Sequence, residues 1–203
     1  MLRPCMNTEP ALSDEVLAAR ASEGSRSAFS SLVVRYRDRV YRLAVRMSQS
    51  ECDAEEVAQE TLFLAHRGIG SFQGESRFST WLYRIAINQV LMRRRAASRR
   101  PVALLGPRAN DEESRLERDS EASESVDELI DRKTLTHRVR EALGRLDESH
   151  RTALVLCDLE ELSSEQAAEV LGITPDAVRQ RAHRARLTLR DRLRGETLGA
   201  VSA

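Results

Sequence analysis

The sequence predicts an all-α protein with two small helical domains joined by a flexible acidic linker. Helix-forming residues dominate the 203 residues, whereas only 9 Gly and 5 Pro occur. Apolar residues recur at helical spacing in two separate stretches, and no alternation of β-branched and aromatic residues is sustained. Between these stretches, residues 101–134 carry 10 acidic residues against 5 basic ones and contain no aromatic residue. A segment of this composition buries too little apolar surface to fold by itself, so we expect a linker.

Residues 1–24 are expected to form an N-terminal extension that includes a short helix. Ser13 is a favourable N-cap, and the two acidic residues that follow it suit the positive end of a helix dipole. The helix can run to about Glu23, and Gly24 then interrupts it.

Three longer helices are expected in residues 25–100, which form the first domain. The first of them begins at Ser27 and the second at Asp53, and both carry apolar residues at i, i+3 and i+4 spacing. Gly68 ends the second helix, and a polar loop over residues 71–77 follows.

The third of these helices is expected to start with Ser79 or Thr80 as its N-cap. Its apolar residues again recur at helical spacing, and Pro101 stops it because proline cannot continue a helix. The helix ends in a cluster of arginines, namely Arg93, Arg94, Arg95, Arg99 and Arg100.

The second domain is expected in residues 135–195 and is followed by a tail over residues 196–203. Two helices are indicated at its start. The first carries apolar residues from Leu135 to Leu146, and the second has Leu159 as the last of its apolar positions.

A helix-turn-helix is expected at the end of this domain. Ser163 or Ser164 caps a short helix, and Gly172 permits the left-handed backbone that the turn requires. Thr174 caps the next helix, with Pro175 at its first position, where the missing N–H is harmless.

The last helix has an apolar stripe and a polar face. Val178, Ala182 and Ala185 recur at helical spacing and form the stripe that we expect to be buried. The guanidinium and amide groups on the other face suit base edges and phosphates in a DNA major groove, although an ordinary solvated basic helix is the alternative interpretation. The candidate DNA-binding residues are Arg179, Gln180, Arg181, His183, Arg184 and Arg186.

The charge pattern argues against a generic polyanion binder, because the formal net charge is zero. The distribution is uneven, since residues 1–100 carry 16 arginines against 11 acidic residues and residues 135–203 carry 11 of each. Lys133 is the only lysine beside 31 arginines. Either codon usage in a GC-rich genome or selection for bidentate phosphate and guanine contacts explains this bias.

The sequence shows no pattern of an enzyme or a metal protein. Cys5, Cys52 and Cys157 are too far apart for a CxxC motif and suit free thiols in a reducing compartment. The histidines form no metal-binding pattern, and no phosphate-binding loop or G-x-S-x-G motif occurs. We therefore expect no enzyme activity, no catalytic residue, no metal and no cofactor. Because no apolar stretch approaches about 18 residues and no signal-peptide pattern is present, we expect a cytoplasmic protein without membrane insertion.

Two segments resemble bacterial sigma factors. The sequences DAEEVAQE (residues 53–60) and FSTWLYRIAIN (residues 78–88) look like the second conserved region of that family. The segment from Leu146 to Leu193 is similar to the fourth region. No third region lies between them, so the layout resembles the extracytoplasmic-function (ECF) subgroup. The chain departs from the usual residues of the family, and so leaves the promoter sequence open, at Gln166, Ala177 and Gln180.

The resemblance implies a polymerase-binding site on the helix that begins at Asp53. In the family, this acidic helix docks on the clamp helices of the polymerase β′ subunit. Without the resemblance, the same side chains would be interpreted as a solvated helix face. The residues implied are Asp53, Glu56, Gln59 and Glu60.

The resemblance also implies two DNA sites. The exposed face of the last helix would read the minus-thirty-five element. The first domain would capture a base flipped from the minus-ten element, and unstacking that base costs a few kcal/mol that the pocket must offset. For Trp81 two roles remain open, a buried core position and a platform on which a base stacks. The residues implied for the minus-ten element are Phe72, Ser76, Phe78, Trp81, Asn88, Arg93 and Arg94.

The implied function is that of a transcription initiation factor, which directs core RNA polymerase to promoters and promotes DNA opening. Its implied partners are the β and β′ subunits of the polymerase, promoter DNA and an anti-sigma factor. The alternative is a stand-alone helix-turn-helix transcription regulator. That alternative leaves the first domain unexplained and predicts a symmetric dimer on a palindrome, for which the chain shows no dimerisation heptad. Whether the two domains pack together stays open at the level of the sequence.

Overall fold

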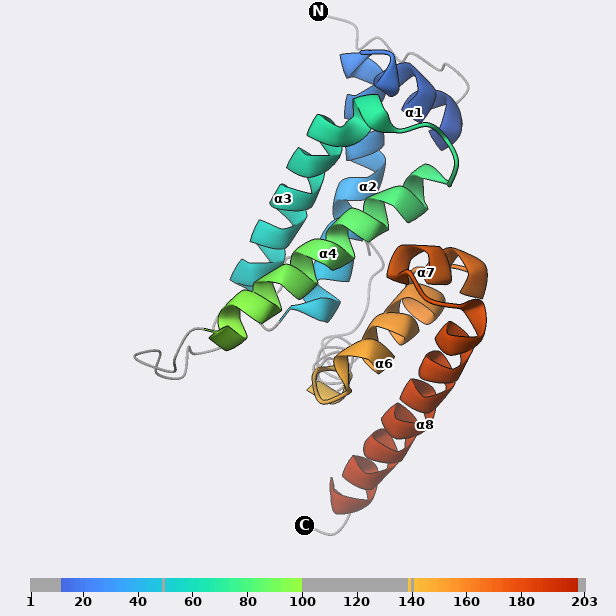
Figure 1. Ribbon diagram of the computed structural model, residues 1–203. Helices are drawn as coiled ribbons and strands as arrows, with labels where there is room; N and C mark the ends of the chain where they lie inside the picture. The colour runs from blue at the N-terminus through green and yellow to red at the C-terminus, as the bar shows by residue number, and fades with distance from the viewer. Residues whose placement is uncertain (1–11, 49, 100–138, 140, 201–203) are drawn as a thin grey trace, which may run out of the picture.

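The computed structural model describes residues 12–48, 50–99, 139 and 141–200 (Figure 1). The regular secondary structure of these residues is all helical and no strand is found among them, in agreement with the all-α prediction. The elements in chain order are α1 (Asp14–Ser22), α2 (Arg26–Met47), α3 (Glu51–Gly68), η1 (Ile69–Ser71), α4 (Phe78–Arg99), α6 (Glu148–Leu154), η3 (Val155–Leu159), α7 (Ser164–Leu171) and α8 (Pro175–Ala200). The predicted linker over residues 101–134 lies outside the described residues, as does Leu135.

The first domain consists of α1 to α4. Helix α3 packs against both α2 and α4, and α1 packs across the start of α2 (Figure 1). The apolar stripe predicted for α2 is buried, with Leu32, Val40 and Leu43 each at most 1% exposed. Burial of this stripe stabilises the bundle, because removing apolar surface from water contributes about 25 cal/mol per Å².

Helices α2 and α3 begin earlier than the predicted starts at Ser27 and Asp53. In each case the residue just before the observed helix is a serine that acts as the N-cap. The hydroxyls of Ser25 and Ser50 accept the backbone N–H three residues later, at 3.3 and 3.1 Å. These bonds satisfy donors that the first helical turn leaves without partners, so each helix starts directly after its cap.

Helix α4 begins at Phe78, so the predicted N-caps Ser79 and Thr80 are instead inside the helix. Phe78 is 2% exposed and Thr80 is 1% exposed. The burial of the Phe78 ring draws the helix start toward the core, and the carbonyl of Arg77 accepts the first intrahelical bond.

The second domain contains the predicted helix-turn-helix. Ser163 and Gln166 form a reciprocal capping box at the start of α7, with bonds of 3.2 and 2.9 Å. Gly172 adopts φ 65°, the left-handed conformation in which a side chain is strained. The Thr174 hydroxyl accepts the N–H of Ala177 at 3.3 Å and caps α8. Helix α8 extends to Ala200, into the segment predicted as a tail.

The second helix predicted at the start of this domain, with Leu159 as its last apolar position, has a different form, because its second half is the π-helical turn η3. The N–H of Glu160 donates to the carbonyl of Val155, five residues back, at 3.0 Å. A π turn holds more residues than an α turn, so it changes which side chains face the core. Leu159, predicted as an apolar core position, is 41% exposed, whereas Glu160 is only 8% exposed.

The two domains pack against each other, which settles the question that the sequence leaves open. One continuous apolar cluster includes Met47 and Ile87 from the first domain and Leu156 and Val170 from the second. Figure 1 shows α7 lying beside α4 at this contact. Among the residues described, no helix combines the length and the apolar character that a membrane crossing requires.

Candidate nucleic-acid interface

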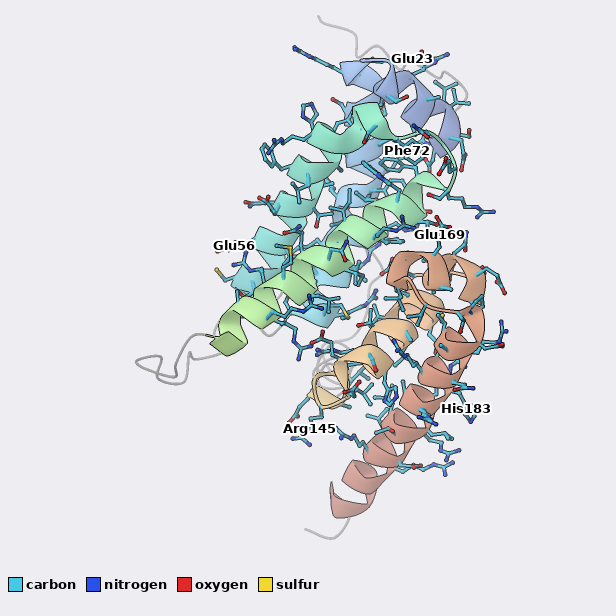
Figure 2. The ribbon with its side chains drawn as sticks, viewed as in Figure 1. Glu23, Glu56, Phe72, Arg145, Glu169 and His183 are labelled. Carbon is cyan, nitrogen blue, oxygen red and sulfur yellow. The ribbon has the colours of Figure 1, made fainter. Side chains whose placement is uncertain are left out.

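An aromatic cluster lies where the loop after α3 meets the start of α4. The ring centroids of Phe72 and Trp81 are 5.4 Å apart, and that of Phe78 lies 6.0 Å from the first and 5.7 Å from the second. Phe78 is buried, so it supports the other two rings and does not itself face solvent. Phe72 and Trp81 are half-buried, with part of each ring at the surface (Figure 2 labels Phe72).

Trp81 is half-buried, so part of its ring packs in the core and part reaches the surface. A Cβ at Gly68 would lie 3.4 Å from the indole ring, which is an ordinary van der Waals contact, so the ring packs directly against the end of α3. Asn88 follows seven residues later on α4, which is two helical turns and therefore the same face. The Asn88 side chain is exposed, and Ser76 in the loop is half-buried.

The arginines predicted to contact DNA near the end of α4 are engaged by carboxylates. Arg93 pairs with Glu56 and lies 3.6 Å from Asp53, so it joins α4 to the face predicted to bind polymerase. Arg94 lies 3.0 Å from Glu148, which belongs to the second domain.

The predicted polymerase-binding residues lie together along α3. Glu56, Gln59 and Glu60 are exposed, and Figure 2 shows Glu56 on the outer side of the helix. Phe63, one turn further, is 53% exposed, and the guanidinium carbon of Arg67 lies 5.7 Å from its ring centroid. Phe63 lies outside the apolar stripe of α3, and its ring is therefore at the surface.

Helix α8 presents the polar face that the sequence predicts. Val178, Ala182 and Ala185 are at most 2% exposed and hold the helix against the domain core. Figure 2 shows His183 on the side of α8 that points away from the first domain. Arg181 is half-buried, and the other predicted DNA-binding residues are exposed, namely Arg179, Gln180, His183, Arg184 and Arg186.

Two of these arginines already have acidic partners. Arg186 donates to both carboxylate oxygens of Asp158, at 2.7 and 2.6 Å, and this hydrogen bonding raises the pKa of the Arg186 guanidinium. Arg179 pairs with Asp176 and lies 3.5 Å from Glu165. DNA phosphates would therefore have to compete with carboxylates for these two side chains.

A buried carboxylate joins the two domains. Glu160 accepts a hydrogen bond of 2.7 Å from the Tyr83 hydroxyl and one of 2.8 Å from the Arg46 guanidinium. Burial, and then the nearby Glu160 charge, raise the pKa of the Tyr83 hydroxyl, while burial lowers the pKa of Arg46. Nothing in the sequence marks this trio, because its members lie far apart along the chain.

A second polar contact flanks this trio. Arg84 donates to the backbone carbonyl of Glu169 at 2.9 Å and lies 3.3 Å from its carboxylate. Figure 2 shows Glu169 where α7 meets α4.

Comparison with known proteins finds a match for each of the two domains. Residues 32–100 match Sigma-70 region 2, and residues 136–189 match Sigma-70, region 4. The chain is 36% identical over 185 residues to the ECF RNA polymerase sigma-E factor of Haemophilus influenzae, which covers 90% of this chain and 96% of that protein.

Solved structures show the same fold. The structure of CnrH in complex with the cytosolic domain of CnrY matches with a TM-score of 0.66 and 28% identity, over 90% of this chain and 97% of that one. The sigma factor RpoE in complex with the anti-sigma factor NepR from Bartonella quintana matches with a TM-score of 0.62 and 22% identity, over 82% and 96% of the two chains. The chain therefore belongs to the ECF group of sigma-70 factors, the proteins that direct bacterial RNA polymerase to promoters and promote initiation.

Proposed function

We propose that this sigma factor divides promoter recognition between its two domains. Residues 25–100 bind the polymerase and capture unpaired bases of the minus-ten element, and residues 135–195 bind the minus-thirty-five element as duplex. Residues 101–134 connect the two domains, and residues 1–24 and 196–203 flank them. The observation that carries this proposal is the presence of two different surfaces, an aromatic one on α4 and an arginine-rich one on α8.

The surface on α4 suits an unpaired base. Phe72 and Trp81 offer ring faces on which a base can stack, and Asn88 supplies an exposed amide on the same helix face as Trp81. Stacking on an aromatic side chain contributes about 1–3 kcal/mol per base, which is comparable to the cost of extruding the base. Ser76 extends this surface into the loop, and Phe78 supports it from the core.

The surface on α8 suits duplex DNA. The second helix of a helix-turn-helix lies in the major groove and presents its N-terminal side chains to the base edges. Gln180, His183 and Arg184 occupy that exposed part of α8, and arginine makes bidentate contacts with guanine. Arg181 and Arg186 flank this face and can reach phosphates.

We propose that the acidic face of α3 docks on the clamp helices of the polymerase β′ subunit. Hydrogen-bond acceptors lie along one side of the helix, on Asp53, Glu56, Gln59 and Glu60, and the exposed Phe63 ring adds apolar contact area.

We further propose that the protein acts in the cytoplasm and has no catalytic activity, because the polymerase supplies the chemistry. By analogy with the RpoE–NepR structure, we propose that an anti-sigma factor controls it.

Run-off transcription with bacterial core polymerase tests the division of labour. The templates are one duplex promoter and the same promoter with its minus-ten segment already unpaired. Asn88→Ala should reduce transcription about tenfold or more on the duplex and less on the unpaired template, because its role is to stabilise the open strand. Arg184→Ala should reduce transcription equally on both templates and weaken discrimination at the upstream element by about 1–3 kcal/mol.

The matched control is Arg20→Ala, which removes an exposed arginine from α1 and should leave transcription unchanged. Equal effects of Asn88→Ala on both templates would contradict the assignment of Asn88. If the protein bound promoter DNA by itself but never conferred initiation on core polymerase, it would be a stand-alone regulator.

A further inference from the structure

We infer that Arg77 binds a phosphate of the unpaired DNA strand whose base is captured on the aromatic surface of α4. This inference rests on the proposed capture of minus-ten bases and deepens it, because it names the group that holds the backbone of that strand. Arg77 is not among the residues predicted to contact the minus-ten element, and it lies between two of them, Ser76 and Phe78.

Arg77 occupies a position that is unfavourable for arginine. Its carbonyl accepts the N–H of Trp81 at 3.1 Å, so Arg77 is the N-cap residue of α4. The side chain of an N-cap stabilises a helix by accepting an N–H of the first turn, whereas arginine carries donors only. The positive end of the helix dipole also repels a guanidinium. Both effects make arginine less stabilising here than serine or aspartate.

The other helices follow the capping rule that α4 breaks. Among the α-helices whose starts the structure describes, α1, α2, α3 and α7 have serine as the N-cap, α6 has aspartate and α8 has threonine. In each of these helices the cap side chain accepts an N–H of the first turn. An exception to a local rule that the rest of a chain obeys is expected where function requires it.

The guanidinium of Arg77 is available to a ligand. The side chain is exposed and has no ion-pair or hydrogen-bond partner among the residues that the structure describes. By contrast, Arg84, Arg93 and Arg94 on the same helix each pair with a carboxylate. A guanidinium without such a competitor suits the oxygens of a phosphate, which it can bind through two parallel hydrogen bonds.

A buried hydroxyl at the same end of α4 also lacks a protein partner. Thr80, in the first turn, is 1% exposed, and its Oγ1 makes no hydrogen bond within the described part of the chain. The Cα–Cβ bond of a helical residue tilts toward the helix N-terminus, so this hydroxyl is directed toward the end at which Arg77 lies. A phosphate at Arg77 would supply an acceptor that this hydroxyl can reach through a water molecule.

Arg77 lies beside the aromatic surface. Trp81 follows it by four residues, which is one helical turn, and residues so spaced have Cβ atoms about 5–6 Å apart on one face. The Phe72 ring, labelled in Figure 2 in the loop that leads to α4, has its centroid 5.4 Å from that of Trp81. A phosphate is joined to its base through one sugar. A base stacked on either ring therefore places a phosphate within reach of the Arg77 side chain.

Binding of a single strand to the holoenzyme tests this contact. The holoenzyme is core polymerase with the full chain, and the ligand is a fluorescent oligonucleotide with the minus-ten sequence of a promoter that it transcribes. Fluorescence anisotropy at several salt concentrations should show that Arg77→Ala makes the slope of log K against log salt less steep by about 0.7, the value for one phosphate on a single strand. Arg77→Lys should keep the slope, because it keeps the charge.

Methylphosphonate substitution locates the phosphate. Each phosphate of the oligonucleotide is replaced in turn by an uncharged methylphosphonate. With the original protein, one replacement should reproduce the loss of affinity that Arg77→Ala causes. With Arg77→Ala, that replacement should cause no further loss, because the two changes remove the same contact. Asn88→Ala, in contrast, should weaken binding without changing the slope.

Arg77→Ser separates a DNA contact from a structural role. Serine is a favourable N-cap, so this variant should raise the unfolding temperature and still lose the same slope as Arg77→Ala. Arg20→Ala, which removes an exposed arginine from α1, is the control and should leave the slope unchanged.

An unchanged slope for Arg77→Ala, or equal losses from every methylphosphonate with both proteins, would overturn the phosphate contact and leave the proposed function standing. If the holoenzyme bound the minus-ten strand no better than a scrambled one, the proposed base capture would fail, and the contact that rests on it would fail as well.

Discussion

At the scale of single residues, the direction of the Glu160 side chain depends on a local irregularity of the backbone. Glu160 follows the π-helical turn η3, and the wider turn directs it inward while Leu159 is left exposed. In a regular α-helix through the same residues, both side chains would point in different directions around the helix axis. The local backbone therefore decides which carboxylate reaches Arg46 and Tyr83.

Asp147 provides a residue-scale prediction with a definite pH dependence. It caps α6, and its carboxylate accepts the N–H and the hydroxyl of Ser149 at 2.9 and 2.6 Å. These bonds lower the pKa of Asp147. A carboxyl with a lowered pKa stabilises the folded state above its unfolded pKa, about 3.9, and this contribution is lost as the pH falls through the lower, folded value.

We therefore expect Asp147→Ala to cost about 1 kcal/mol of unfolding free energy at neutral pH, and the difference from the original protein should shrink in acid, because the protonated carboxyl keeps only a neutral acceptor at the cap. Chemical denaturation at a series of pH values measures this dependence. Asp147→Asn is the control, because it keeps an oxygen acceptor at the cap without a titrating group. A cost for Asp147→Ala that stayed constant into acid would refute the cap assignment.

At the scale of elements, the turn between α7 and α8 depends on backbone conformation alone. Gly172 has φ 65°, yet a Cβ there would meet nothing within 4 Å. Gly172→Ala should therefore destabilise the protein by about 1–2 kcal/mol through strain without any steric clash. Gly144→Ala is the matched control, since that glycine is helical, also meets nothing within 4 Å, and should be neutral or stabilising. Equal thermal unfolding of the two variants would exclude strain as the reason for glycine.

The recognition face of α8 gives a second prediction at this scale. Asp158 holds Arg186 through two hydrogen bonds, so Asp158→Asn should free that guanidinium for a phosphate. DNA affinity should rise, and the slope of log K against log salt should steepen by about one. Asp191→Asn is the control, because it removes the same charge from Arg190, which is outside the proposed face. Fluorescence anisotropy measures both slopes. An identical slope for the two variants would show that Arg186 does not contact DNA.

At the scale of the whole molecule, the shared apolar cluster couples the two domains. Ile87 belongs to this cluster, whereas Ile85, two residues earlier on α4, packs only against the first domain's own cluster. Ile87→Ala should cost about 2–5 kcal/mol and increase amide hydrogen exchange in both α4 and α7. Ile85→Ala should increase exchange in the first domain and spare α7. If Ile87→Ala left α7 protected, the domains would be stable independently of each other.

The sequence by itself determined the features that depend on neighbouring residues. The helical class, the caps at Ser13 and Ser163, and the left-handed turn at Gly172 follow from hydrogen bonds and backbone preferences within a few positions. The buried stripe and exposed face of α8 follow from helical periodicity, and the structure confirms both. The family also follows from the sequence, because its motifs are contiguous.

Only the tertiary structure decided the features that depend on residues far apart in the chain. Helices α2, α3 and α4 start at residues other than those predicted. Helix α4 does so because the burial of Phe78 outweighs the capping preference of Ser79 and Thr80. The packing of the domains, the burial of Glu160 and the pairing of Arg94 with Glu148 join segments from both domains. Periodicity and spacing describe one helix at a time, so they cannot show which faces of different helices exclude water together.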